Sequence, residues 1–552
     1  MVNDKCKGTL IELNNYEYIW DDKEKLTLSI LECSDNYEFF LEEVSTKLNN
    51  IHRINKSKQY YRILIGNWLL FYIHTCWDRY TSVLIYGEEI GSIGKLDLSK
   101  SNAYIPYDFN DFAKKTSSSD LYNLQLYTKL YDHIFSKNNL PTVEIEWESG
   151  ERSKRHSRGY KHIIFSFLSY IVKKTRKEYI LITEPYFKEK SLKSIIKLIF
   201  YTGFRVAFEN KSKCFPHDSQ IKDDLRCALR VETDDKFRQF IANNILSDMP
   251  IIFLENYKES RLKALNNYLK IPKVIYTSTA LHANFNIKFL LAEYHKEITV
   301  ISQQHGATYG LNHIHSMEEY EKRISDIYLT AGWVDSKKCI PFCIPRLCNN
   351  SKNQENSSQI LFVPTYSFSY ITRLEYYPRS QYYRTRYFDL MACFLKGLKL
   401  PNELSNLMIR PYPNPYSLKK IQGIIDKYHL THSVSKCGSI EQSIVNSKLV
   451  VMDHLGTTML DTMSRNIPTV VFCDPKIQKY RNGGLNIIKE LIECKILHES
   501  PDLAYQHINH INSNVEKWWG TATVQNARMN FVSKYARNIK EWEKEDIMPF
   551  EY

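Results

Sequence analysis

Two segments of the sequence place polar side chains directly after a run of apolar and β-branched residues. QQHG (303–306) follows ITVIS, and DHLGTT (453–458) follows LVVM. Such runs predict short strands of a parallel sheet, and open parallel sheets bind ligands beyond the carboxyl ends of their strands. Imidazole, hydroxyl and carboxylate groups at these positions indicate proton transfer and anion binding.

The first segment carries a histidine on a predicted tight turn. Gly306 permits the turn, so the imidazole of His305 can stand at the tip of the strand. Histidine is well suited to take a proton from an attacking hydroxyl near neutral pH. We therefore predict that His305 and its neighbour Gln304 are catalytic. The alternative is a turn histidine satisfied by the backbone.

The second segment predicts an anion site at the start of a helix. Gly456, Thr457 and Thr458 offer free N–H groups, hydroxyl donors and the positive end of a helix dipole. Asp461, one turn later, is expected to hold a hydroxyl of the ligand. The same residues could instead form a plain N-cap, and the segment is not a Walker loop.

Two further strand tips carry polar groups. Arg410 follows LMI, and a guanidinium there suits fork-like recognition of phosphate. Thr365 follows ILFVP, where it could line the same crevice or lie in a simple turn.

Carboxylates in the first half of the chain are candidates for the acceptor side. Asp108 and Asp111 lie beside aromatic residues in IPYDFND, and Glu184 follows YILIT. Carboxylates and aromatic rings together often hold sugar-like hydroxyls. A surface Asx turn is the equal alternative for the first two.

The pattern of predicted secondary structure changes near residue 177, from helices to strands that alternate with helices. The first 140 residues read mainly as helices, with an apolar stripe of helical period over residues 62–78. Short apolar strands then alternate with helices, which indicates βαβ units. The strands are expected at 179–183, 273–277, 298–302, 327–330, 360–364, 407–410, 449–453 and 469–473.

This alternation predicts an α/β protein with two Rossmann-like, doubly wound lobes and a helical N-terminal elaboration. Ile327–Thr330 is expected to be the first strand of the second sheet, so the boundary is placed near residue 320. Residues 1–320 would form the first lobe together with the helical elaboration, and residues 321–552 the second lobe.

Composition excludes several classes of protein. The 43% apolar and 25% charged residues of this 552-residue chain argue against global disorder. Twelve cysteines are too few for a disulfide scaffold. The spacing of Cys339, Cys343 and Cys348 lacks paired C-x2-C blocks, so we expect no metal there.

The formal net charge of +12 favours anionic partners. Part of the excess falls in residues 152–162, which could dock on an anionic membrane or simply form a solvated loop. The N-terminus lacks a signal-like apolar region, and the apolar runs fall short of the roughly 20 residues of a membrane span. We expect a cytoplasmic protein that could also bind peripherally at the inner face of the cell membrane.

Taken in order, the four segments ISQQHGATYG, ILFVPTYS, MIRPYP and DHLGTTMLDTMSRNIPTVVF resemble the CDP-glycerol and CDP-ribitol transferases of teichoic acid synthesis. The wider chain, including ILIGNWLLFYIHTCWDRY and YIPYDFNDF, is similar to a family of bacterial surface-carbohydrate, O-antigen-type transferases. The resemblance implies a GT-B fold, in which two Rossmann-like lobes face each other across a cleft. It also implies that residues 1–320 form the acceptor-side lobe and residues 321–552 the lobe that binds the nucleotide donor.

Carried over to this chain, the resemblance implies a base or transition-state partner at His305. It implies that Arg410, Thr457 and Thr458 grip the donor diphosphate and that Asp461 supports the nucleotide or the transferred group. Tyr412 replaces the usual histidine, the spacing from Asp453 to Thr457 is longer, and Ala307 follows the glycine. A nucleotide sugar is therefore as plausible a donor as CDP-glycerol.

The predicted function is transfer of a sugar or sugar-like group from a nucleotide-activated donor to a lipid-linked precursor of a surface glycan such as O-antigen, capsule or teichoic acid. We expect no metal, no cofactor and no nucleic-acid partner. The alternative is a non-catalytic protein that binds RNA or an anionic glycan on a degenerate scaffold. The chain lacks RNP, KH and zinc-finger signatures.

Overall fold

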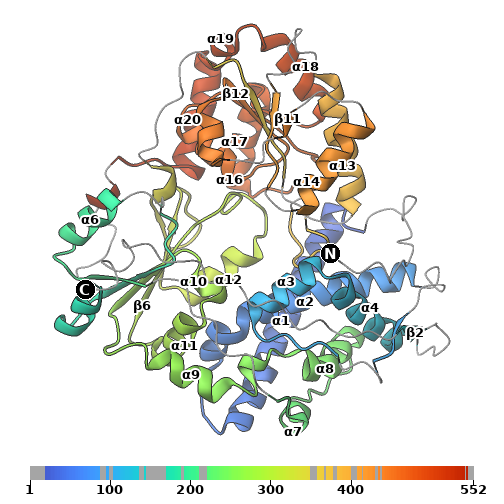
Figure 1. The fold of residues 1–552 in the computed structure, drawn as a ribbon, viewed down its shortest axis with the longest axis vertical. Helices are drawn as coiled ribbons and strands as arrows, with labels where there is room; N and C mark the ends of the chain where they lie inside the picture. Colours follow the sequence, from blue (N-terminus) through green and yellow to red (C-terminus); the bar gives the residue numbers. More distant parts are fainter. Residues whose placement is uncertain are drawn as a thin grey trace.

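The computed structural model describes most of the chain and divides it into a helical region and two α/β lobes (Figure 1). The described residues are 19–87, 95–98, 103–135, 142–143, 169–187, 192–209, 220–348, 357–365, 368–376, 382–398, 407–412, 415–428, 433–434, 438–540 and 542–544. The basic cluster at 152–162 lies outside them.

The N-terminal helical region is built on two long helices, α1 (Lys23–His52) and α2 (Lys58–Tyr86). Asp22 and Ser57 cap their N-termini with side-chain oxygens. The predicted apolar stripe lies on α2, where Trp68 is fully buried. The remaining elements here are β1 (Lys95–Leu96), α3 (Phe109–Ser118), α4 (Asp120–Phe135) and β2 (Thr142–Val143).

The first lobe contains a six-stranded parallel sheet in the order β4-β3-β5-β6-β7-β8. Its central strands are buried along their whole length, as expected for a sheet covered on both faces. The strands are β3 (Ile180–Thr183), β4 (Val206–Glu209), β5 (Val274–Thr277), β6 (Thr299–Gln303), β7 (Ile327–Thr330) and β8 (Cys339–Pro341). The helices are α6 (Leu192–Tyr201), α7 (Asp223–Cys227), α8 (Lys236–Asp248), η1 (Ile251–Phe253), α9 (Tyr257–Leu265), α10 (Ala280–Ala283), α11 (Phe285–Tyr294), α12 (Ser316–Ile324) and η2 (Pro345–Leu347).

The second lobe contains another six-stranded parallel sheet, in the order β11-β10-β9-β12-β13-β14. Its strands are β9 (Ile360–Val363), β10 (Leu407–Ile409), β11 (Ser433–Val434), β12 (Leu449–Met452), β13 (Thr469–Phe472) and β14 (Leu497–His498). The helices are α13 (Tyr382–Gly397), α14 (Pro415–Lys427), α15 (Ile440–Val445), α16 (Thr457–Ser464), α17 (Asn482–Glu493), α18 (Pro501–Ile511), α19 (Val515–Trp519) and α20 (Ala522–Tyr535).

Both strand orders are those of doubly wound sheets, in which the chain starts near the middle and winds outward in both directions. The predicted fold class, α/β with two Rossmann-like lobes and a helical N-terminal elaboration, is confirmed. The GT-B-like description fits because the two lobes stack end to end, with α16 of the upper lobe facing the lower one (Figure 1).

One predicted strand belongs to the other sheet. Ile327–Thr330 pairs with β6 and β8 of the first sheet, so it is not the first strand of the second. The second sheet begins with β9, and the change of sheet falls between Pro341 and Ile360. The apolar run reads the same in either sheet, and only its hydrogen-bonded neighbours decide where it belongs.

Two segments of the second half of the chain pack on the first half. Near the C-terminus, Trp542 in η4 (Trp542–Lys544) packs on the ring of Phe187, with centroids 5.0 Å apart. Residues 368–376, which follow β9, pack into the helical region, where Ile371, Leu374 and Tyr376 join its core. The two halves of the chain are therefore held together by these packing contacts as well as by the connection between the two sheets.

No helix in the described part of the chain is both long and apolar enough to cross a membrane.

Candidate functional site

Each sheet has a point where the strand order reverses, and polar residues follow the strands there. In the first sheet this point lies between β3 and β5, and in the second between β9 and β12. Ligands of doubly wound proteins bind in the crevice outside the carboxyl ends at such points. Glu184 and Ser278 follow β3 and β5, whereas Thr365 and Asp453 follow β9 and β12.

His305 lies two residues beyond the end of β6, as predicted. The left-handed residues of its turn are Thr308 (φ 70°) and Gly310 (φ 69°), and not Gly306. At Gly310 a Cβ would come within 2.3 Å of the Trp333 ring. Both this close contact and the left-handed backbone favour glycine at this position.

The side chain of Gln304 holds this turn in place. Its Oε1 accepts hydrogen bonds from the backbone N–H of Ala331 (2.9 Å) and from Trp333 Nε1 (2.8 Å). Its Nε2 donates to the carbonyl oxygen of Gly306 (2.9 Å). Because both ends of the amide are engaged, the geometry supports a positioning role for Gln304 beside the candidate base.

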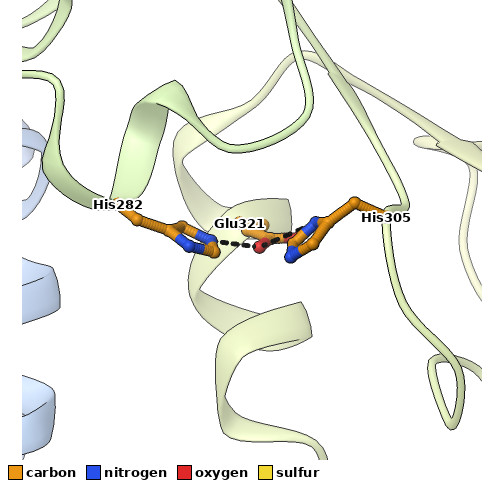
Figure 2. A group of neighbouring side chains, drawn as sticks. All are labelled: His282, His305 and Glu321. Atoms are coloured by element: carbon orange, nitrogen blue, oxygen red, sulfur yellow. Dashed lines mark hydrogen bonds and ion pairs between the residues drawn. The ribbon is translucent and has the colours of Figure 1, made fainter. Parts of the chain in front are cut away.

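The ring of His305 faces a buried carboxylate. Glu321, on α12, lies with Oε1 3.9 Å from His305 Nδ1 and accepts a hydrogen bond from His282 Nε2 at 2.6 Å. The carboxylate therefore lies between two imidazoles that approach it from α10 and from the tip of β6 (Figure 2). His305 Nδ1 is buried and makes no hydrogen bond to any described residue, so within the described chain the interpretation as a turn histidine satisfied by the backbone fails.

Burial sets the protonation of this cluster. It lowers the pKa of His305 to about 4, although Glu321 opposes the shift, and it lowers the pKa of His282 to about 3. Burial raises the pKa of Glu321, while the His305 charge and the hydroxyls of Tyr328 and Tyr309 oppose the change. Both imidazoles are consequently neutral near neutral pH.

Tyrosines and a cation from the second half of the chain surround the cluster. Tyr328 donates to Glu321 Oε2 at 2.8 Å, and Tyr309 donates to Oε1 at 3.3 Å. Arg373, in the segment after β9, contributes to the lowered pKa of both histidines. The first lobe thus supplies the reactive groups, and the segment after β9, which packs on the helical region, supplies a nearby charge.

Glu184 lies at the switch point of the first sheet, with a left-handed backbone (φ 42°) unusual for a non-glycine residue. Its carboxylate accepts hydrogen bonds from Asn284 Nδ2 (3.0 Å) and Thr279 Oγ1 (3.2 Å). It is also close enough to His282 to affect the pKa of that residue. Of the three predicted acceptor-side carboxylates, Glu184 is the one that lies beside the histidine cluster.

The other two acidic candidates form the start of a helix. Asp108 is the N-cap of α3 and accepts from the backbone N–H of Asp111 at 2.9 Å. Asp111 accepts from the Tyr104 hydroxyl and from the backbone N–H of Tyr107, each at 2.9 Å. This geometry favours the Asx-turn interpretation over acceptor binding.

In the second lobe, the two loops at the switch point are joined to each other. Asp453 Oδ1 accepts from the backbone N–H of Thr365 (2.8 Å) and lies 2.8 Å from Nδ1 of His454. The His454 ring packs over the next turn so closely that a Cβ on Gly456 would lie 2.2 Å from Nε2. A residue with a Cβ at position 456 would therefore force the His454 ring to move.

The start of α16, after Gly456, has hydrogen-bond donors that are not used within the described protein. Gly456 is the N-cap of α16 and provides no side-chain cap. Thr457 and Thr458 are half-buried, and among the described residues their hydroxyls have no hydrogen-bond partner. The plain N-cap alternative thus lacks its hydrogen bond, and the free donors fit an anion.

Two other predicted donor-side residues are paired within the protein. Asp461 Oδ1 lies 2.8 Å from Arg465 Nε. Arg410 donates to Ser443 Oγ at 3.1 Å and to the carbonyl oxygen of Gly438. Arg410 lies at the same edge of the sheet, one strand beyond β9, and it fixes the loop before α15.

The predicted segments meet at a pocket between the lobes. Its wall comes from the loop after β6, the start of α16 and α20, through Gln304, Ala307, Thr308, Tyr309, Leu311, Leu455, Gly456, Met459, Leu460, Phe531 and Tyr535. The rings of His305 and Tyr309 are 5.5 Å apart, so the candidate base lies next to this wall. Segments about 150 residues apart, QQHG and DHLGTT, therefore contribute to one pocket.

His282 and Glu321 are the two functional candidates absent from the sequence prediction. Glu321 lies in SMEEYEKRI, which reads as a solvated charged helix, and its burial depends on Tyr309 and Tyr328 from other elements. His282 follows β5 by five residues, and its position near a strand tip was the available signal. Cys339, one of the three cysteines whose spacing was considered for a metal site, donates a hydrogen bond to Asp335 Oδ1 at 3.0 Å.

The fold and site define a two-lobed α/β protein of the transferase type. The chain belongs to the LIC12162 family of transferases, whose sequence profile matches residues 7–547. The predicted membership of a transferase family is confirmed, while the CDP-glycerol-type donor stays a prediction.

No curated protein matches the chain. Among similar solved structures, Acinetobacter baumannii MurG has 9% identity, covers 68% of this chain and 99% of its own, and has a TM-score of 0.36. A glycosyltransferase from Rickettsia africae ESF-5 has 11% identity, 68% and 98% coverage and a TM-score of 0.34. UDP-GlcNAc 2-epimerase from Neisseria meningitidis, bound to UDP-GlcNAc, has 10% identity, 64% and 98% coverage and a TM-score of 0.33.

Proposed function

We propose that this transferase is a glycosyltransferase that moves a sugar or sugar-like group from a nucleotide-activated donor to a precursor of a surface glycan. One observation carries the proposal. The QQHG turn of the first lobe and the Gly456 helix start of the second lobe line a single pocket. His305, whose ring lies 5.5 Å from that of Tyr309 in the pocket wall, is the proposed proton acceptor, and the helix start after Gly456 is the proposed anion cradle.

In the proposed reaction His305 takes the proton of the acceptor hydroxyl. Its Nδ1 is buried and directed at Glu321, while 19% of the side chain stays exposed, so Nε2 is the nitrogen left for a substrate. A proton on Nδ1 would point toward Glu321 and leave the Nε2 lone pair free. The carboxylate then stabilises the imidazolium that forms.

The start of α16 is proposed to bind the donor phosphates. The N–H groups and the unpaired hydroxyls of Thr457 and Thr458 would offset the charge that develops on the leaving phosphate. With these donors in place, transfer needs neither a metal ion nor a cofactor. Arg410 would support the cradle through the α15 loop, and Asp461 and Thr365 would line the nucleotide side.

The acceptor is proposed to be lipid-linked, and the protein to work in the cytoplasm, where it would bind the inner face of the membrane peripherally. The net charge of +12 and the basic cluster at 152–162 support attraction to anionic lipid. A nucleotide sugar and a CDP-activated polyol phosphate are both compatible with the cradle.

Thermal shift with UDP, CDP, GDP and CMP tests the donor side. We expect one nucleotide to stabilise the wild type and Thr458→Val to lose most of that shift. Thr46→Val on the exposed face of α1 is the matched control and should keep it. Stabilisation by none of the four, together with salt-steep binding of single-stranded RNA, would instead favour the RNA-binding alternative.

A further inference from the structure

Three potential metal ligands meet where α10, the tip of β6 and α12 come together. The ligand atoms of His282, His305 and Glu321 all lie within 4.8 Å of one another. Glu321 Oε1 is 2.6 Å from His282 Nε2 and 3.9 Å from His305 Nδ1, and the two rings are 5.2 Å apart. The fold alone brings these groups together, because their sequence spacing matches no metal motif.

The chemistry of the group suits a transition metal. Two imidazoles with one carboxylate form a ligand set that Zn²⁺ and its neighbours accept, with a remaining position for water or substrate. His305 Nδ1 is buried, points at the carboxylate and has no hydrogen-bond partner in the part of the chain that the structure describes (Figure 2). A buried lone pair without a partner is costly unless something binds it.

The surroundings orient the carboxylate as metal sites require. Tyr328 donates to the second carboxylate oxygen at 2.8 Å, and Tyr309 contacts the first at 3.3 Å. Outer hydrogen bonds of this kind fix the ligands of metal sites. Bonds of about 2.0 Å in a tetrahedral site separate ligand atoms by about 3.3 Å. His305 would therefore move in, and His282 out, by well under 1 Å each.

We propose that His282 Nε2, His305 Nδ1 and Glu321 Oε1 bind one divalent ion of the Zn²⁺ class, and that the bound ion switches the transferase off. The first half rests on the geometry alone. The second half rests on the proposed function, because it concerns the base role of His305.

The switch follows from the two nitrogens of one ring. As a base, His305 needs a free lone pair on Nε2, so the proton of the neutral ring sits on Nδ1. As a ligand, it needs the lone pair of Nδ1, so the proton moves to Nε2. A ring that binds the metal through Nδ1 can donate a hydrogen bond to the acceptor but cannot take its proton.

Two other groups of the described residues show what this site has that they lack. His498 and His507 also have rings 5.2 Å apart, but no carboxylate completes a ligand group with them. Glu318 and Asp335 form an acidic group with Glu319, and Lys322 lies within 3.0 Å of all three. The histidine pair is therefore a matched control, and the acidic group is already paired with the ammonium of Lys322.

Metal binding is tested by calorimetric titration of the EDTA-treated full chain with ZnCl₂. We expect one tight site in the wild type. Affinity should fall at least tenfold in Glu321→Gln and His282→Gln and stay unchanged in His498→Gln and His507→Gln. Tyr328→Phe, which removes an outer hydrogen bond to the carboxylate, should weaken binding by about 10-fold as well. Equal affinity in the wild type, Glu321→Gln and His282→Gln would overturn the proposal, as would an equal loss in His507→Gln.

The switch is tested by transfer assays at increasing Zn²⁺. We expect inhibition that EDTA reverses, and a half-inhibiting concentration at least tenfold higher in His282→Gln than in the wild type, whatever the basal rate of the variant. Full transfer at saturating Zn²⁺ would refute the switch. If no donor is turned over while the binding pattern holds, the metal site stands and the glycosyltransferase proposal fails.

Discussion

The two sheets share a topology of winding but carry different chemistry at their carboxyl edges. The first edge gathers buried titratable groups, with His305 and His282 on either side of Glu321. The second edge gathers backbone N–H groups and hydroxyls around Gly456, and its acidic residue Asp453 is used within the loops. Desolvated imidazoles suit proton transfer, whereas a helix start suits a phosphate.

Under the proposed function, the difference means that one architecture separates the two tasks of a transfer reaction. The lobe proposed to hold the acceptor needs a group whose protonation can change. The lobe proposed to hold the donor needs fixed positive ends of dipoles that do not titrate. The following changes are ordered by the size of their expected effect on this division.

Removing the base should have the largest effect. We expect His305→Ala to lower kcat by about 10²- to 10⁴-fold, because proton transfer by a positioned side chain contributes about that much. Donor affinity, measured by thermal shift, should change only a few-fold. His295→Ala, in the same lobe at the end of α11, is the control. An unchanged kcat in purified His305→Ala would show that His305 is not the base.

Removing a hydroxyl of the cradle should act on the donor and leave the base alone. We expect Thr457→Val and Thr458→Val each to weaken donor binding by about tenfold or more, because each loses a hydrogen bond to a charged group. The pH dependence of transfer should stay as in the wild type. A shifted pH profile with unchanged donor affinity would reverse the proposed assignment of the two edges.

Acid should destabilise the protein in part through the buried histidines of the first edge. Burial lowers the folded-state pKa of His282 to about 3 and of His305 to about 4, below the ordinary value of 6.5. The unfolded chain then binds more protons below pH 6.5, so the free energy of unfolding should fall as pH drops from 6.5 toward 4. In urea titrations His282→Gln should show a shallower fall than wild type. An equal slope would contradict the burial of this ring.

The smallest effect is expected at a carboxylate that the structure assigns to a helix start. Asp108→Ala should cost about 1 kcal/mol of stability through loss of the α3 N-cap. The acceptor KM should not change, which transfer assays at varied acceptor concentration would check. A raised KM would indicate that Asp108 contributes to acceptor binding.

Local patterns were enough for the predicted strands and for the helical stripe of α2, because period and β-branching are properties of short segments. The same locality explains the failures. Ile327–Thr330 has the pattern of a buried parallel strand, and nothing within it says which sheet it joins. The positions of His305 and Gly456 could be predicted because each follows its own strand. The burial of Glu321 could not, because distant tyrosines create it.

Arg79 on α2 carries a consequence for the order in which the chain matures. Its buried guanidinium donates to the Ile371 carbonyl, to Asp78 and to Asn123, so one of its three partners arrives 292 residues later in synthesis. Until the ribosome has delivered residues 368–376, the helical region keeps an unfilled apolar groove and an incompletely satisfied cation. The nascent N-terminal half should therefore wait about 15–60 s for its partner segment, at about 5–20 residues per second.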